Sequence, residues 1–130
     1  MEKGKHILLK DLEVYKLACE LSRIGWGIYS NLDWRDKKTM GDQFLTATDS
    51  VGGNIVEGYS HYHYLEKIKF LYNARASLAE ATDHWLELLK ERGKLSEEKY
   101  QEYRRASREA SIKLQNFIAA IYKAKSKNKQ

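Results

Sequence analysis

Apolar side chains recur along three segments of this chain at intervals of three and four residues, a spacing that lines one face of an α-helix. The first stripe comprises Val14, Leu17, Leu21, Ile24 and Ile28. The second comprises Met40, Phe44, Ala47, Val51 and Ile55, and the third Tyr103, Ser107, Ala110, Leu114, Phe117 and Ile121. The chain also contains no proline, which helix interiors exclude. These features predict three long helices.

A fourth helix is predicted between the second and third stripes, from about Tyr64 to Arg92, where apolar residues form several rows. The rows are Leu71, Leu78 and Trp85; Tyr72, Ala79 and Leu86; and Ala74, Ala81 and Leu88. Because successive residues lie about 100° apart on a helix, these rows cover more than half of its circumference. We therefore expect this helix either to lie at the centre of the protein or to pack against a second subunit.

Residues with strong positional preferences mark the helix ends. Asp33 or Asp36 can cap the second helix, and Ser96 can cap the last one, with acidic residues in its first turn. Gly58 and Gly93 are predicted to end the second and third helices, since glycine takes the left-handed conformation readily. Four long helices with short links predict an all-α, antiparallel, up-and-down four-helix bundle.

The net charge of +5 is concentrated at one end of the 130-residue chain. Without the four lysines of residues 123–130 the net charge falls to +1. The sequence therefore predicts a short leader at 1–10, a bundle at 11–122 and a basic, disordered tail at 123–130. No apolar run approaches the length of a membrane span, and a lone cysteine, Cys19, excludes an internal disulfide. We expect a cytoplasmic protein.

The stretch from Ser50 to Gly58 is unusually rich in small residues. No lysine follows Gly58, so a phosphate-binding loop is excluded, and no strand precedes the glycines, which excludes a dinucleotide fingerprint. The periodicity places Gly52 and Gly53 inside a helix, where they permit a close helix–helix approach. Asn54 and Glu57 share a helix face, and buried polar groups need partners. We predict a structural buried polar network of Asn54, Glu57, Arg75, Ser77 and Glu80; the alternative is a ligand pocket there.

Sequence patterns typical of catalysis or metal binding are missing. His61 and His63 supply two ligands at most, with no familiar spacing to a third. Glu80 and His84 are four residues apart, whereas di-iron bundles use a repeated three-residue spacing. The sequence predicts no enzyme, no metal, no cofactor and no small-molecule substrate.

Basic side chains on the last predicted helix form a candidate nucleic-acid contact surface. It comprises Arg104, Arg105, Arg108 and Lys113, together with the tail residues Lys123, Lys125, Lys127 and Lys129. In an oligomer, several copies of this surface would add their weak contacts with a polyanion.

Several segments, in order and spacing, resemble one known family. The run Gln43, Ala47, Ser50, Asn54, Ile55, Glu57, Gly58 is similar to its "Q…A…S…NI-x-EG" signature. Residues 66–80 resemble its "EF-x-x-FL-x-x-A-x-GS-L-x-E" segment, and residues 11–16 its opening "DL-x-V-x-x". This family is the four-helix bundle proteins of 23S rRNA intervening sequences, also called S23 ribosomal proteins. It resembles, in turn, the accessory variability proteins of diversity-generating retroelements.

The resemblance implies a ring-forming homo-oligomer, a homopentamer, as several members of that family form. It also implies, through the retroelement proteins, contact with RNA or with a nucleic-acid enzyme such as a reverse transcriptase. The chain departs from the family at the positions after the signature glutamate and glycine, where basic residues are replaced by His61 and Tyr62. The predicted function is a non-enzymatic oligomeric binding or scaffold protein that contacts RNA through its basic surface and tail. The alternative is a purely protein-binding or self-assembling scaffold.

Overall fold

The computed structural model describes residues 8–128, with only the backbone at positions 11, 127 and 128. This part of the chain contains helices and turns and no β-strand. The elements are η2 (Leu9–Asp11), α1 (Glu13–Ser30), α2 (Trp34–Asp36), η3 (Lys37–Gly41), α3 (Asp42–Ser60), α4 (Tyr64–Ala79), η4 (Glu80–Trp85), α5 (Leu86–Glu91) and α6 (Glu97–Asn128). Helix η3 continues into α3, and α4 continues through η4 into α5. These two continuous segments, together with α1 and α6, make four long helical rods.

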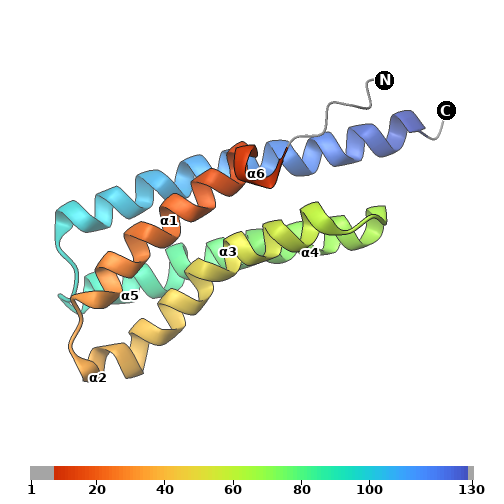
Figure 1. Ribbon diagram of the computed structural model, residues 1–130. Helices are drawn as coiled ribbons and strands as arrows, with labels where there is room; N and C mark the ends of the chain where they lie inside the picture. Colours follow the sequence, from red (N-terminus) through yellow and green to blue (C-terminus); the bar gives the residue numbers. More distant parts are fainter. Residues whose placement is uncertain (1–7, 129–130) are drawn as a thin grey trace.

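The four rods alternate in direction, as Figure 1 shows, and surround a single core. Helix α1 packs against α3 and α6, and α4 packs against the same two helices from the other side. The predicted stripes supply most of the buried side chains. Large fully buried members of the stripes are Leu21, Phe44, Ile55, Leu71, Leu86, Leu114 and Tyr103, and Leu89, which lies in none of the predicted rows, is fully buried as well. The prediction of an all-α antiparallel four-helix bundle is confirmed.

The predicted capping residues hold the helix ends. Oδ1 of Asp33 accepts a hydrogen bond from the backbone N–H of Asp36 at 2.9 Å. Oγ of Ser96 accepts one from the N–H of Lys99 at 3.2 Å. Gly93 follows α5 with a φ of 71°, the left-handed conformation that helix-ending glycines adopt. The expected ends of these helices are confirmed.

Gly58 does not end its helix, contrary to the prediction. Helix α3 continues to Ser60, and within the described residues only Gly93 has a positive φ. A Cβ atom at position 58 would lie 2.8 Å from Cδ2 of Leu71 and 3.3 Å from the backbone oxygen of Lys67. Glycine is therefore required at this position because α4 approaches α3 closely.

The predicted disordered tail is wrong for residues 123–128, because α6 continues without a break to Asn128. Lysine and alanine both favour helix, so the segment can extend an existing helix. Lys125 also gains a tertiary contact, with Nζ lying 4.7 Å from the ring centre of Tyr64. Residues 129–130 and 1–7 of the predicted tail and leader lie outside the described residues. No described helix has the length and apolar character needed to cross a bilayer.

The polar groups inside the core are hydroxyls rather than charges. The hydroxyl of Tyr103 lies 2.7 Å from Oγ1 of Thr48, and Oγ1 of Thr82 lies 2.8 Å from Oγ of Ser107. All four residues are buried. Gly25 of α1 faces this site, because a Cβ atom there would lie 3.0 Å from Cγ2 of Thr48. These hydroxyl pairs join α3, η4 and α6 without a buried charge.

Replacing Tyr103 by Phe is expected to destabilise the bundle by about 1–2 kcal/mol, because it leaves the Thr48 hydroxyl without this partner. Burial raises the pKa of Tyr103 well above its usual range, against a smaller lowering by hydrogen bonds with Thr48 and Thr82. The unfolded chain therefore loses the Tyr103 proton above about pH 10, while the folded protein keeps it. The contribution of protonated Tyr103 to the free energy of unfolding is therefore fully present below about pH 10. Above that pH it falls by about 1.4 kcal/mol per pH unit.

Urea denaturation between about pH 8 and pH 11 measures both effects. The Phe variant should start less stable at about pH 8 and lose less stability above about pH 10. Parallel pH profiles for the two proteins would contradict the assignment of this proton to Tyr103.

Candidate nucleic-acid interface

A surface groove of about 290 Å³ lies between the α4–η4 rod and α6. Three arginines line it, Arg75 from α4 and Arg104 and Arg108 from α6. Among the described residues of its lining, Thr82, Ser107 and Ser111 bear hydroxyls and Asp83 is the one acidic residue. The Thr82 and Ser107 hydroxyls are buried and hydrogen-bonded to each other, so the donors exposed in the groove are the guanidiniums and the Ser111 hydroxyl. Guanidinium and hydroxyl groups are the usual side-chain donors to phosphate, so this lining suits a phosphodiester.

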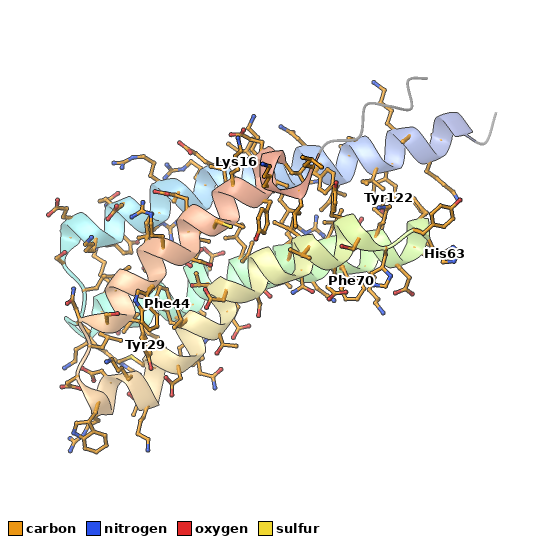
Figure 2. All side chains as sticks on the ribbon, in the orientation of Figure 1. Lys16, Tyr29, Phe44, His63, Phe70 and Tyr122 are labelled. Atoms are coloured by element: carbon orange, nitrogen blue, oxygen red, sulfur yellow. The ribbon has the colours of Figure 1, made fainter. Side chains whose placement is uncertain are left out.

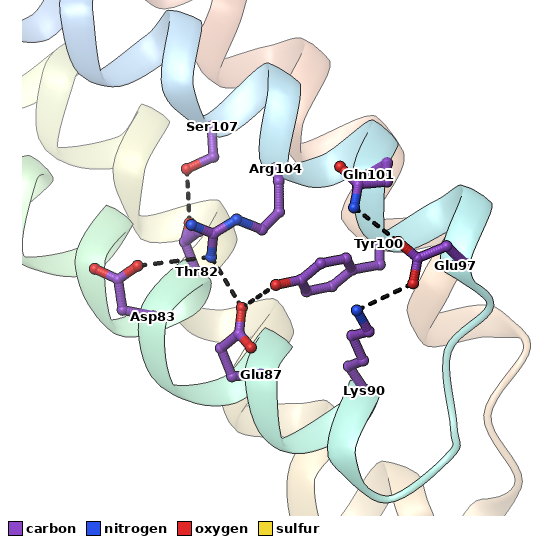
Figure 3. Close-up of polar contacts among 9 residues, drawn as sticks. All are labelled: Thr82, Asp83, Glu87, Lys90, Glu97, Tyr100, Gln101, Arg104 and Ser107. Atoms are coloured by element: carbon purple, nitrogen blue, oxygen red, sulfur yellow. Dashed lines mark hydrogen bonds and ion pairs between the residues drawn. The ribbon is translucent and has the colours of Figure 1, made fainter.

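Arg104 is held at one end of the groove by acidic groups of the facing rod. Its NH1 lies 2.9 Å from Oε2 of Glu87 and 3.9 Å from Oδ1 of Asp83 (Figure 3). The guanidinium carbon also lies 5.8 Å from the ring centre of Tyr100. The side chain remains 33% exposed, so the guanidinium is oriented without being removed from solvent.

A second set of contacts fixes the groups around Arg104, at the end where α5 and α6 meet (Figure 3). The Tyr100 hydroxyl donates to Oε2 of Glu87 at 2.5 Å, and this hydrogen bond raises the pKa of the Tyr100 hydroxyl. Nζ of Lys90 lies 3.9 Å from the Tyr100 ring centre and 3.0 Å from Oε1 of Glu97. Hydrogen bonds from Gln101 and Lys90 in turn lower the pKa of Glu97. These contacts set the position of Arg104 relative to the groove.

Arg75 and Arg108 are more exposed than Arg104. NH1 of Arg75 donates to Oε1 of Gln115 at 3.3 Å, and its guanidinium lies 4.6 Å from the ring centre of Tyr72. Arg108 has no ion-pair partner in the part of the chain that the structure describes. Within that part, two of the three groove arginines are therefore free of carboxylates and available to an anion.

The basic residues predicted on α6 do not form one strip. Arg104 and Arg108 line the groove, whereas Arg105 and Lys113 are exposed and do not line it. Of the tail lysines, Lys123 is exposed and Lys125 packs over Tyr64. The side chain of Lys127 and all of Lys129 lie outside the described residues. The sequence prediction missed the groove because Arg75, on another helix, completes it.

The predicted buried polar network does not form. Asn54 donates to the backbone oxygen of Ser50 at 2.9 Å, within its own helix. The Glu57 side chain is 55% exposed and lies 3.4 Å from Nε2 of His61. The other three members are also placed elsewhere: Arg75 bonds Gln115, Ser77 is half-buried, and Glu80 accepts from Nε1 of Trp85 at 2.9 Å.

The reason is the orientation of α3. The buried face of this helix carries Thr48, Val51, Ile55 and Gly58, so Glu57 points away from the core. Asn54 and Glu57 do share a face, but that face lies outside the core, with Asn54 half-buried and Glu57 exposed. No group of three histidine, cysteine, aspartate or glutamate side chains among the described residues could hold a metal ion.

A cluster of tyrosines at the other end of α6 was not predicted as a functional site. The hydroxyls of Tyr72 and Tyr122 lie 2.5 Å apart, and the rings of Tyr64 and Tyr122 meet edge to face at 5.9 Å. Figure 2 shows Tyr122 on α6 at the same end of the bundle as His63, next to the α3–α4 turn. The sequence feature that could have indicated this cluster is the concentration of tyrosines at 59–64, together with the lysines at 123–127.

The fold and the groove define a small all-helical bundle protein with an arginine-lined surface. Over residues 10–116 the chain matches the family described as 23S rRNA-intervening sequence protein, and it belongs to that family. This confirms the resemblance carried by residues 43–58 and 66–80. The relationship to retroelement accessory proteins stays a prediction.

The fold is also similar to a crystal structure at 1.70 Å resolution, that of a protein with unknown function from the S23 ribosomal protein family of Bacteroides thetaiotaomicron VPI-5482. The TM-score is 0.76 at 26% sequence identity, and the alignment covers 82% of this chain and 96% of the other. A comparison with curated proteins finds no match.

Proposed function

We propose that this chain is a non-enzymatic, cytoplasmic RNA-binding protein that places RNA phosphates in the groove between α4 and α6. The observation that supports this most directly is the convergence of Arg75, Arg104 and Arg108 on one groove. The planar guanidinium presents donors that match phosphate geometry, and such charge-assisted hydrogen bonds are stronger than neutral ones.

The groove contacts phosphates rather than reading a base sequence. Its donors are guanidinium and hydroxyl groups, which bind phosphate and sugar oxygens and thereby fix the position of the strand. The carboxylates of Asp83 and Glu87 keep one end of the groove from being uniformly positive. RNA binding through this groove should depend strongly on salt and weakly on sequence.

The protein acts as a homo-oligomer in this proposal, most simply as a pentameric ring. Trp26 is 59% exposed and Trp34 is 69% exposed in the single chain. Because tryptophan is enriched at protein interfaces, both side chains are candidates for contacts between subunits. Trp85, the third tryptophan of the chain, is instead half-buried and donates to Glu80. A ring would display several grooves, and their weak contacts with one RNA would add through effective concentration.

Light scattering of the protein, with structured RNA added and salt titrated from about 50 to 300 mM, tests this proposal. We expect an oligomer whose RNA affinity falls steeply with salt, because phosphate contacts release counterions. An oligomer that ignores RNA at the lowest salt would contradict the proposal.

The exposed tryptophans favour one second candidate, a scaffold that binds another protein, such as a nucleic-acid enzyme. Large exposed aromatic side chains are favoured anchors of protein interfaces. This candidate becomes the better account if the oligomer forms and RNA does not bind.

A further inference from the structure

A second cavity, of about 190 Å³, lies where the α3–α4 turn meets the last turns of α6. Its lining consists of Tyr62, Tyr64, Lys67, Ile121, Ala124 and Lys125. This volume is below the roughly 300 Å³ at which pockets for drug-sized ligands begin. The cavity therefore suits one planar ring system better than a large ligand.

One aromatic wall of this cavity is held in place. Tyr64 meets Tyr122 edge to face, and the Tyr122 hydroxyl lies 2.5 Å from that of Tyr72. Lys125 lies over the Tyr64 ring, with Nζ at 4.7 Å from the ring centre. Because Tyr122 and Lys125 both contact Tyr64, and Tyr72 in turn holds Tyr122, an incoming ring would meet a side chain that is already ordered.

The other aromatic side chain is exposed. Tyr62 is 89% exposed and contacts the edge of the neighbouring His63 ring at 5.5 Å. A tyrosine exposed beside an apolar cavity can pack over a ring that enters it. The two tyrosines thus provide one fixed and one adaptable stacking surface.

Among the described residues, the charged groups that line the cavity are both cationic. Nζ of Lys67 donates to the backbone oxygens of Gly58 at 3.3 Å and Tyr59 at 3.2 Å, and burial lowers the pKa of Lys67. Lys125 supplies the second ammonium group. The nearest acidic residue in the sequence, Glu66, lies 3.5 Å from Nζ of Lys69 and does not line the cavity. A ligand with an aromatic ring and a negative charge complements this site.

We propose that this cavity, the tyrosine pocket, binds one unpaired nucleobase of RNA, with the adjoining phosphate at Lys67 and Lys125. The inference rests on the proposed function and deepens it, since it specifies single-stranded RNA as the ligand. Proteins that bind single strands combine basic tracks with aromatic rings on which bases stack. A paired base remains stacked inside its duplex and cannot enter such a pocket.

The arginine groove and the tyrosine pocket lie along the same helix. Arg104, Arg108, Gln115 and Tyr122 recur on one face of α6, and Lys125 lies one turn beyond. With a rise of 1.5 Å per residue, Arg104 and Lys125 are about 30 Å apart along the helix. A strand whose phosphates lie in the groove can therefore reach the pocket along α6.

The test compares a single-stranded oligouridylate with a blunt RNA duplex of the same length, by fluorescence anisotropy of end-labelled probes. Tyr62→Ala removes one stacking surface, and Ala124→Leu fills the cavity without removing a core side chain. Both variants should bind the single strand about fivefold or more weakly, the effect of losing one stacked base, and bind the duplex as before. Ala120→Leu, at an exposed alanine one turn earlier that does not line the cavity, is the matched control for Ala124→Leu.

Three results would overturn the inference in distinguishable ways. If both pocket variants bind the single strand like the unaltered protein, the pocket plays no role, while the proposed function stands on its salt-dependent binding. If they weaken both probes equally, the pocket does not select unpaired bases. If the unaltered protein binds neither probe at low salt, the proposed function fails and the inference fails with it. Thermal melting of each variant establishes that a loss of binding is not a loss of folding.

Discussion

Replacing Arg75, Arg104 and Arg108 together by glutamine is expected to weaken RNA binding about tenfold or more near 0.1 M salt. The three guanidiniums line one groove, so the triple variant removes its positively charged phosphate donors and leaves Asp83 as the charged side chain in the described lining. Removing one phosphate interaction with a single strand lowers the magnitude of the log–log salt slope by about 0.7. The triple variant should therefore bind with a slope smaller by about two.

The matched control replaces three arginines outside the groove, Arg23, Arg35 and Arg92, by glutamine. These side chains are exposed and the change in net charge is the same. Its RNA affinity should fall only slightly, because general attraction to a polyanion is screened beyond about 10 Å at 0.1 M salt. Equal losses in the two triple variants would show that net charge, rather than the groove, determines binding.

The groove substitutions should not unfold the protein. The Arg104 ion pairs with Asp83 and Glu87 lie at the surface, where such pairs contribute about 0–1 kcal/mol each. The buried hydroxyls beneath the groove, Thr82 and Ser107, are unchanged. Circular dichroism melting of both triple variants checks this, and a similar melting temperature makes the binding comparison valid.

The bundle could be predicted from sequence because helix burial is a local pattern. Val51 and Ile55 are four residues apart, and this spacing places them on one face whatever the rest of the chain does. The same holds for Leu114, which follows Ala110 by four residues on α6. The caps at Asp33 and Ser96 could be predicted for the same reason, since each side chain accepts a hydrogen bond from a backbone N–H only three residues away.

The groove could not be predicted in this way, because it depends on which sides of two helices face each other. Arg75 was assigned to a network with Asn54 and Glu57, yet its partner is Gln115 of α6. Periodicity shows that residues share a face but does not show which other helix covers that face. The spacing of two residues between Ile55 and Glu57, about 200° around the helix, nevertheless indicated that Glu57 points outward.

The glycines of α3 provide a stability test of how closely its neighbours approach. Gly53 and Gly58 both have helical backbone, since neither has a positive φ. Nothing lies within 4 Å of a Cβ atom built at Gly53. At Gly58 the same atom would lie 2.8 Å from Cδ2 and 3.0 Å from Cγ of Leu71. Leu71 is fully buried and the nearby Lys67 oxygen belongs to the backbone, so neither can easily move away.

Alanine at these two positions should therefore have opposite effects. Gly53→Ala is expected to stabilise the protein by about 0.5–1 kcal/mol, because alanine favours helix and the new methyl group meets no neighbour. Gly58→Ala gains the same propensity but is expected to destabilise by about 1–3 kcal/mol, because the methyl group separates α3 from α4. Urea denaturation midpoints at constant m-value measure both changes.

Gly53→Ala also serves as the control for Gly58→Ala, since it makes the same chemical change in the same helix. If both variants were stabilised equally, the α3–α4 contact at Leu71 would be looser than the structure shows, and packing would not account for Gly58. If only Gly58→Ala is destabilised, the close contact holds the α3–α4 turn, where the oxygens of Gly58 and Tyr59 accept from Lys67. The glycine would then support the tyrosine pocket indirectly, by fixing the lysine that lines it.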